Sequence, residues 1–178
     1  DDKDIEAVII ATPVSTHYEL AKKALMAGKH ILIEKPFTEK SAQAKELIEI
    51  AKTKNLTILV DHIFIFSPAV NKIKELVTKS SFGEICYYDS TRVNLGLFQS
   101  DVNVVWDLAI HDLSIMSYIL DTEVKSVSAT GHSLEKNNPE YVGYLSLNLE
   151  NNCIAHINVN WLSPVKIRNT LIGDKQKM

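Results

Sequence analysis

The residues best suited to chemistry follow a short apolar run over 31–33. This Ile-Leu-Ile run is typical of a buried β-strand, and Glu34, Lys35 and Pro36 follow it directly. Ligands of open α/β sheets bind outside the carboxyl ends of the strands, where we expect Glu34 and Lys35 to lie. The Lys35 ammonium could bind a substrate oxygen or stabilise a forming alkoxide, or it could be an edge-strand lysine that opposes aggregation. Glu34 could pair with Lys35 or accept a hydrogen bond.

A second candidate group lies on a predicted helix over 104–120. Asp107 and His111 are one helical turn apart, so the carboxylate can hold one ring nitrogen while the other acts as a base. An oriented base of this kind can take a proton from an alcohol. The same spacing also occurs in purely structural pairs. Ser114 and Tyr118 continue this polar stripe on an otherwise apolar helix, so they must find protein partners, a ligand or water.

Thr12, Pro13 and His17 form a third group, after the first apolar run of the chain. They place polar groups at the end of a predicted strand and at the N-terminus of the next helix, a favourable position for the anionic or polar parts of a nucleotide. Ordinary helix capping explains the same residues equally well.

Arg92 and Asn94 close a predicted strand over 84–94, just before a loop over 96–103. They could bind substrate phosphate or hydroxyl groups, or they could be solvated. The remaining histidines show no spacing that selects them and are interpreted as structural: His30, His62, His132 and His156.

Cys86 and Cys153 are far apart in the sequence, and each lies inside a strand-like run. This separation argues against a disulfide framework and against a zinc site. We interpret both as core thiols and predict no metal site.

The composition is that of an ordinary globular chain. Its 178 residues, 46% hydrophobic and 23% charged, suffice for one full core or two small ones. A net charge of -3, a pI near 6.1 and the lack of a basic block give no reason to expect nucleic acid, so we expect a small-molecule partner. No apolar run approaches the roughly 18 residues of a membrane span, and the acidic start is unlike a signal peptide. We therefore expect no membrane partner and a cytoplasmic protein.

Two kinds of pattern predict two domains. Over 1–62, apolar strands at 7–11, 31–33 and 56–60 alternate with helices over 16–28 and 41–54, which indicates a parallel sheet with right-handed crossovers. Over 63–178, a helix that begins at Ser67-Pro68 precedes a series of strands interrupted only by the helix over 104–120. These strand patterns lie at 84–94, 124–132, 141–149, 153–161 and 167–172. We therefore expect an α/β chain: the C-terminal part of a Rossmann-type parallel sheet, followed by an α+β domain with a largely antiparallel open sheet.

Taken together, these residues resemble the Gfo/Idh/MocA oxidoreductases, which act on sugars and cyclitols. The resemblance rests on Val8–Pro13 followed by His17, on Glu34-Lys35-Pro36, on Phe82-Gly83-Glu84-Ile85 and on Asp107-x-x-x-His111. Within the family, residues 92–99 and 104–108 are most similar to dehydrogenases of nucleotide-sugar biosynthesis. Those enzymes oxidise the 3-hydroxyl of UDP-N-acetyl sugar derivatives.

The resemblance implies a mechanism. Lys35 would lie between the nicotinamide and the substrate hydroxyl, facing His111 across a shared cavity, and the Lys35–Pro36 bond would be cis. His111 would accept the hydroxyl proton, and Asp107 would hold the tautomer of His111 while hydride moves to NAD or NADP. The residues implied on the cofactor side are Thr12, Pro13, His17, Glu34 and Lys35. Arg92 and Asn94 are the candidates for substrate binding.

The resemblance also implies that part of the fold is missing. The family's Gly-rich phosphate loop would precede Asp1, in a segment of roughly 60 residues, and the chain stops soon after its last strand. We therefore expect residues 1–178 alone to bind cofactor poorly and to be inactive.

Two further expectations concern function and assembly. The alternative to an enzyme is a non-catalytic sugar-binding or regulatory protein on the same fold. A homo-oligomer formed through the C-terminal sheet is compatible with either. Apolar positions such as Val142, Tyr144, Leu145 and Leu147 give that sheet hydrophobic surface for a partner.

Overall fold

The computed structural model describes residues 2–79, 83–96, 98–99, 101–136 and 138–175. It divides the chain into two units, Asp1–His62 and Ile63–Met178, and each has its own hydrophobic core. Phe82 and Leu97, which belong to the sequence patterns above, lie outside the described residues.

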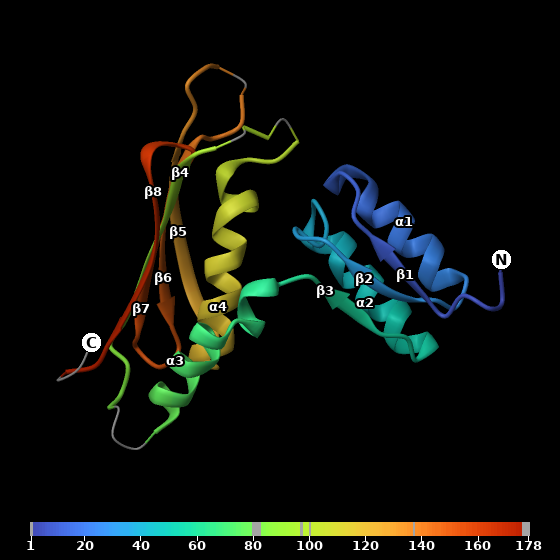
Figure 1. Ribbon diagram of the computed structural model, residues 1–178, viewed down its shortest axis with the longest axis horizontal. Coiled ribbons are helices and arrows are strands. Elements are labelled where there is room, and N and C mark those ends of the chain that lie inside the picture. The colour runs from blue at the N-terminus through green and yellow to red at the C-terminus, as the bar shows by residue number, and fades with distance from the viewer. Residues whose placement is uncertain (1, 80–82, 97, 100, 137, 176–178) are drawn as a thin grey trace. The chain divides into compact units, whose positions relative to one another are not determined.

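The first unit is a βαβαβ arrangement. Its strands β1 (Ala7–Ile10), β2 (His30–Ile33) and β3 (Ile58–Val60) are all parallel and lie side by side in that order (Figure 1). The crossover helices are α1 (Val14–Met26) and α2 (Ser41–Lys54). The helices and one sheet face share a single core: Ile10, Ala21, Leu25, Ile31, Ile33, Leu47 and Ala51. The predicted parallel sheet is therefore confirmed.

The prediction that the first strand is buried is wrong for one of its faces. Ile9 of β1 is 73% exposed and Leu59 of β3 is 49% exposed. Both helices contribute to the same core, so they cover one face of the sheet, and the described residues leave the other face uncovered. Helix α1 also begins two residues earlier than predicted, at Val14, and ends before Gly28, whose φ of 76° suits glycine.

The second unit contains a five-stranded sheet in the order β5-β6-β7-β4-β8. The strands are β4 (Tyr87–Leu95), β5 (Val124–His132), β6 (Val142–Leu149), β7 (Ile154–Asn160) and β8 (Leu162–Gly173). Every neighbouring pair is antiparallel except β4 and β7, which are parallel. The largely antiparallel sheet is confirmed, and the parallel pair arises because β4 lies between two strands that come much later in the chain.

Helices cover one face of this sheet (Figure 1). They are the 3-10 turn η1 (Ile63–Phe66), α3 (Pro68–Thr78), the π-helical turn η2 (Val105–Ala109) and α4 (Ile110–Leu120). Ser67 caps α3 as predicted, because its side chain accepts a hydrogen bond from the Val70 backbone.

Strand β6 shows how the sheet divides its two faces. Leu145 and Leu147 are buried in the core with α4, whereas Tyr144, which directly precedes Leu145, is 46% exposed on the uncovered face. The expectation that both leucines offer surface to a partner is therefore wrong, because strand alternation turns them toward the helices.

The two cysteines are neighbours in the fold although they are far apart in the sequence. Tyr87 of β4 pairs with Ile154 of β7, and Ile154 donates its backbone N–H to the carbonyl of Cys86 at 3.2 Å, so Cys86 and Cys153 begin adjacent strands. Both are free thiols; Cys153 is buried, and this burial raises its pKa. Among the described residues no group of three or more histidine, cysteine, aspartate or glutamate side chains could hold a metal ion. None of the helices in the same part of the chain is long and apolar enough to cross a membrane.

Candidate functional site

The carboxyl ends of the three parallel strands coincide in the first unit. The Glu34 backbone N–H donates to the carbonyl of Ile10 at 2.9 Å, and that of Asp61 donates to the carbonyl of Ile33 at 2.8 Å. The residues that follow each strand therefore emerge at one edge of the sheet. This is the edge at which open α/β sheets bind ligands.

His17 holds two of these strand ends together. Its Nδ1 is 3.0 Å from the carbonyl oxygen of Pro36, and its Nε2 is 2.9 Å from that of Thr12. The side chain is buried, so both contacts are shielded from water. His17 therefore supports this edge of the sheet through the backbone on either side of it. The Lys35–Pro36 bond, which precedes this Pro36 carbonyl, is cis, as expected.

The other predicted cofactor residues are more accessible. Thr12 and Pro13 are exposed, and Glu34 and Lys35 are half-buried. Glu34 accepts a hydrogen bond from the backbone N–H of Lys35 at 3.2 Å, which supports the acceptor role among the two considered for it. These groups can reach a ligand placed at the strand ends.

The sequence patterns did not predict two further residues at this edge. Asp61 and His62 directly follow β3, just as Thr12 and Glu34 follow the first two strands. Nδ1 of His62 is buried and lacks a hydrogen-bond partner within the described part of the chain. Burial lowers the pKa of His62, and the Asp61 carboxylate opposes part of this shift. Their position at a strand end was the signal that could have found them.

In the second unit, Asp107 lies in the π-helical turn η2 that precedes α4. Its Oδ2 accepts a hydrogen bond from Nε1 of Trp161 at 3.1 Å. The indole is almost fully buried and packs with the rings of Phe98 and Tyr141, at centroid distances of 6.1 and 6.0 Å. The carboxylate of Asp107 is thus oriented by a side chain that cannot easily move.

His111 occupies the first turn of α4, four residues after Asp107. Its ring meets that of Phe64 edge to face, with a centroid distance of 4.8 Å and an interplanar angle of 81°. Further along the stripe, Ser114 donates to the carbonyl of His111 at 2.7 Å, and Tyr118 donates to Oδ1 of Asn71 at 2.8 Å. Ser114 and Tyr118 therefore have protein partners.

Arg92 forms a buried ion pair that the sequence patterns did not predict. Its Nε and Nη2 donate to the two carboxylate oxygens of Asp112 at 2.8 and 3.0 Å, and the side chains are only 6% and 3% exposed. Asp112 shares the buried face of α4 with Ile115 and Met116. An acid in that apolar stripe was the available signal, since a buried carboxylate needs a partner.

The predicted substrate residues therefore differ in their surroundings. The guanidinium of Arg92 is engaged by Asp112, and Asn94 is half-buried beside the turn at Gly96, where a Cβ on the glycine would lie 2.5 Å from Nδ2 of Asn94. Substrate binding by either residue stays a prediction. Lys35 belongs to the first unit, and Asp107 and His111 to the second, so their meeting at one cavity also stays a prediction.

Family models match both parts of the chain. The model "Oxidoreductase family, NAD-binding Rossmann fold" matches residues 1–62, and the model "GFO/IDH/MocA C-terminal domain" matches residues 70–178.

Curated relatives support the same assignment. The chain is 36% identical to UDP-N-acetylglucosamine 3-dehydrogenase of Acidithiobacillus ferrooxidans over 129 residues, which is 72% of the chain and 40% of the relative. It is 33% identical to scyllo-inositol 2-dehydrogenase (NAD(+)) of Bacillus subtilis over 144 residues, which is 78% of the chain and 42% of the relative. The chain thus spans less than half the length of these relatives.

Solved structures share the fold. The Acidithiobacillus ferrooxidans enzyme, GnnA, superimposes with a TM-score of 0.85 at 30% identity, over 96% of this chain and 55% of that chain. GenD2 from gentamicin A biosynthesis, solved in complex with NAD, gives a TM-score of 0.92 over 98% of this chain and 54% of that chain. Its 19% identity shows similarity of fold alone.

Proposed function

Because this chain belongs to the Gfo/Idh/MocA family of oxidoreductases, we propose that it carries the catalytic residues of an NAD- or NADP-dependent dehydrogenase acting on a sugar or nucleotide-sugar hydroxyl. The observation that carries the proposal is the carboxylate of Asp107, held by Trp161 one helical turn before His111. A carboxylate held in one orientation is what an imidazole base needs to keep a single tautomer.

The cofactor edge fits a nucleotide. Thr12 and Pro13 are exposed at the strand ends, and the buried Nδ1 of His62 lacks a hydrogen-bond partner in the described part of the chain. We assign Thr12, Pro13, Glu34 and the backbone held by His17 to the cofactor side. When bound, the nicotinamide of NAD or NADP supplies the hydride acceptor.

Three side chains act on the substrate in this proposal. Lys35 donates a hydrogen bond to the reacting oxygen and stabilises the negative charge that develops there. His111 takes the hydroxyl proton on a ring nitrogen, and Asp107 stabilises the imidazolium that results. The carbon–hydrogen bond breaks as the proton leaves, so the alcohol becomes a ketone.

We propose a UDP-N-acetyl sugar as the substrate class. This proposal follows the relative named UDP-N-acetylglucosamine 3-dehydrogenase. The relative named scyllo-inositol 2-dehydrogenase (NAD(+)) makes a cyclitol the second substrate class to test. Asn94, beside the turn at Gly96, is the substrate contact we propose. Arg92, with its guanidinium bound to Asp112, is a weaker candidate for direct contact.

Steady-state kinetics on the full-length protein test this function. Reduction of NAD and NADP is followed by absorbance, with UDP-N-acetylglucosamine and scyllo-inositol as substrates. We expect His111→Gln to lower kcat by about 10²- to 10⁴-fold, as is usual for loss of a general base. The exposed His132, changed to Gln, is the matched control and should leave kcat unchanged. Binding of a sugar without any hydride transfer would instead favour the non-catalytic sugar-binding or regulatory alternative.

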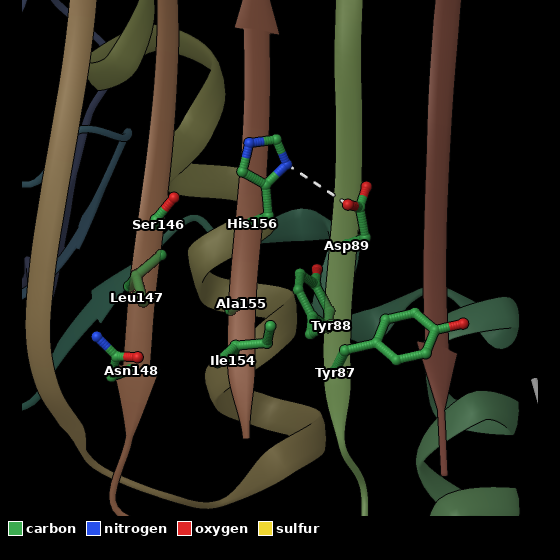
Figure 2. Close-up of a pocket in the computed structure, with 9 residues that line it drawn as sticks. All are labelled: Tyr87, Tyr88, Asp89, Ser146, Leu147, Asn148, Ile154, Ala155 and His156. Atoms are coloured by element: carbon green, nitrogen blue, oxygen red, sulfur yellow. Dashed lines mark ion pairs between the residues drawn. The ribbon is translucent and has the colours of Figure 1, made fainter. Parts of the chain in front are cut away.

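We further propose that two copies associate through the uncovered face of the C-terminal sheet. A hollow of about 390 Å³ lies on this sheet. Its lining residues come from β6, β7 and β4 (Figure 2). Tyr144 and Ile154 expose 46% and 58% of their surface on this face. Nδ1 of His156 lies 3.4 Å from Oδ2 of Asp89 on the same face, so polar groups accompany the exposed apolar side chains that a second copy would cover.

Sedimentation of the full-length protein tests the assembly. Ile154→Asp should shift the protein toward the monomer, because a charge would be buried in the interface. Leu76→Asp, at an exposed position of α3, is the control and should not change the mass. A wild-type protein that is monomeric at micromolar concentration would contradict this assembly.

We also propose a cytoplasmic location, because a dehydrogenase needs the cell's pool of nicotinamide cofactor. Cell fractionation tests this location.

A further inference from the structure

Phe64 lies between a buried cation and His111. Its ring meets the imidazole of His111 edge to face, with the centroids 4.8 Å apart. The guanidinium carbon of Arg92 lies 4.6 Å from the centroid of the same ring, and that of Arg168 lies 5.8 Å away. All four residues belong to the second unit. Phe64 therefore contacts both the imidazole of His111 and the charged guanidinium of Arg92.

Arg92 is fixed independently of Phe64. Its planar fork binds both carboxylate oxygens of Asp112, at 2.8 and 3.0 Å, in a pair almost closed to water. A bidentate pair of this kind restricts both position and rotation of the guanidinium. Tyr88 adds a hydrogen bond to the carbonyl oxygen of Asp112 at 3.1 Å.

These contacts and one peptide bond form a closed path. Asp112 directly follows His111 on α4, so the path from Asp112 through Arg92 and Phe64 to His111 returns to its start through one peptide bond. The backbone at Asp112 and the ring of His111 are thus held by the same strand, β4, which carries Arg92. Rotation of the imidazole would break its edge-to-face contact with Phe64, whose ring is held against the guanidinium.

We propose that Phe64 and Arg92 are positioning residues that set the orientation of the His111 ring. This rests on the proposed function, in which His111 is the base. Arg92 then acts indirectly from the protein interior: Asp112 holds its guanidinium, and the guanidinium holds the ring of Phe64. Phe64 does so through an aromatic contact that restricts the plane of the imidazole.

The test compares Phe64→Leu, Phe64→Tyr and Phe66→Leu in the full-length protein. We expect Phe64→Leu to lower kcat by about 10- to 100-fold with KM changed less than about twofold, because a misplaced base slows the reaction more than it weakens binding. Phe64→Tyr keeps the aromatic contact and should restore kcat. Phe66, in the same 3-10 turn but 65% exposed, is the matched control and should have no effect.

A second measurement separates this inference from the proposed function. In protein labelled at histidine, magnetic-resonance relaxation of the His111 ring should report greater mobility in Phe64→Leu and in Arg92→Lys, but not in Phe66→Leu. Unchanged mobility, or unchanged kcat in Phe64→Leu, overturns the positioning role. If the wild-type protein transfers no hydride at all, the proposed function fails, and the mobility measurement still decides whether Phe64 and Arg92 orient the ring.

Discussion

Trp161 donates its indole N–H to Oδ2 of Asp107 at 3.1 Å. A residue between β7 and β8 thus orients the acid that precedes His111 by one turn. The two partners are 54 residues apart in the chain. The indole is almost fully buried, which makes this bond a fixed feature of the helix terminus.

Removing this donor should impair catalysis. Trp161→Phe keeps an aromatic ring but leaves one oxygen of Asp107 without its donor, and hydrogen bonds to charged groups contribute about 1.5–3 kcal/mol. We expect kcat to fall by roughly tenfold or more. Tyr141→Phe, in the same aromatic cluster, is the control and should keep full activity. Equal kcat in Trp161→Phe and wild type would show that the bond does not orient Asp107 for the reaction.

Breaking the buried ion pair from one side should destabilise the second unit. Changing Asp112 to Asn leaves the Arg92 guanidinium without its charge partner, and breaking a buried pair in this way costs about 3–5 kcal/mol. Urea denaturation measures the loss. Replacing both residues, as Arg92→Met with Asp112→Leu, should recover most of it. Glu75→Gln removes an exposed ion pair with Lys72 and Lys79 and should change stability little, since water screens that site.

His17 should be needed for the structure of the cofactor edge. In His17→Phe, the carbonyl groups of Thr12 and Pro36 lose the imidazole as a neighbour. The hydrogen bond that the ring donates to one of them is lost, and an unsatisfied buried carbonyl costs about 1–3 kcal/mol. We expect a lower free energy of unfolding, measured with urea, and weaker cofactor binding by the full-length protein. The exposed His132→Phe is the control. A His17→Phe variant as stable as the wild type would contradict the role assigned to the two ring contacts.

His62 should make folding sensitive to acid. Burial lowers its pKa below the ordinary value of 6.5, so the unfolded chain binds its proton more readily than the folded one. The stabilising contribution is therefore present above the unfolded pKa and is lost as the pH falls through 6.5 toward the lowered folded value. We expect the wild type to lose more stability than His62→Gln between about pH 7.5 and about pH 5, measured by thermal unfolding. Parallel curves for the two proteins would rule out this contribution.

The sequence predicted much of the fold because local patterns determine its elements. The apolar run at 31–33 and the strand-like pattern at 124–132 predicted β2 and β5, and Ser67-Pro68 predicted the start of α3. Helix α4 was also expected, because its sequence is apolar nearly all round except for one polar stripe at helical spacing. What the same patterns could not predict was which face of a strand is covered. Ile9 is exposed because both helices of its unit pack on the opposite face.

The site divides in the same way. Residue type and spacing alone made Lys35 after a strand, and Asp107 four residues before His111, the candidates for the proposed site, because strand ends and helical turns are local features. Tertiary structure decided the partners: Trp161 for Asp107, Asp112 for Arg92, and Phe64 for His111. These contacts join segments that only the sheet order and the helix packing bring together. A single sequence carries no signal for such distant pairings, because they depend on how several elements bury their apolar faces at once.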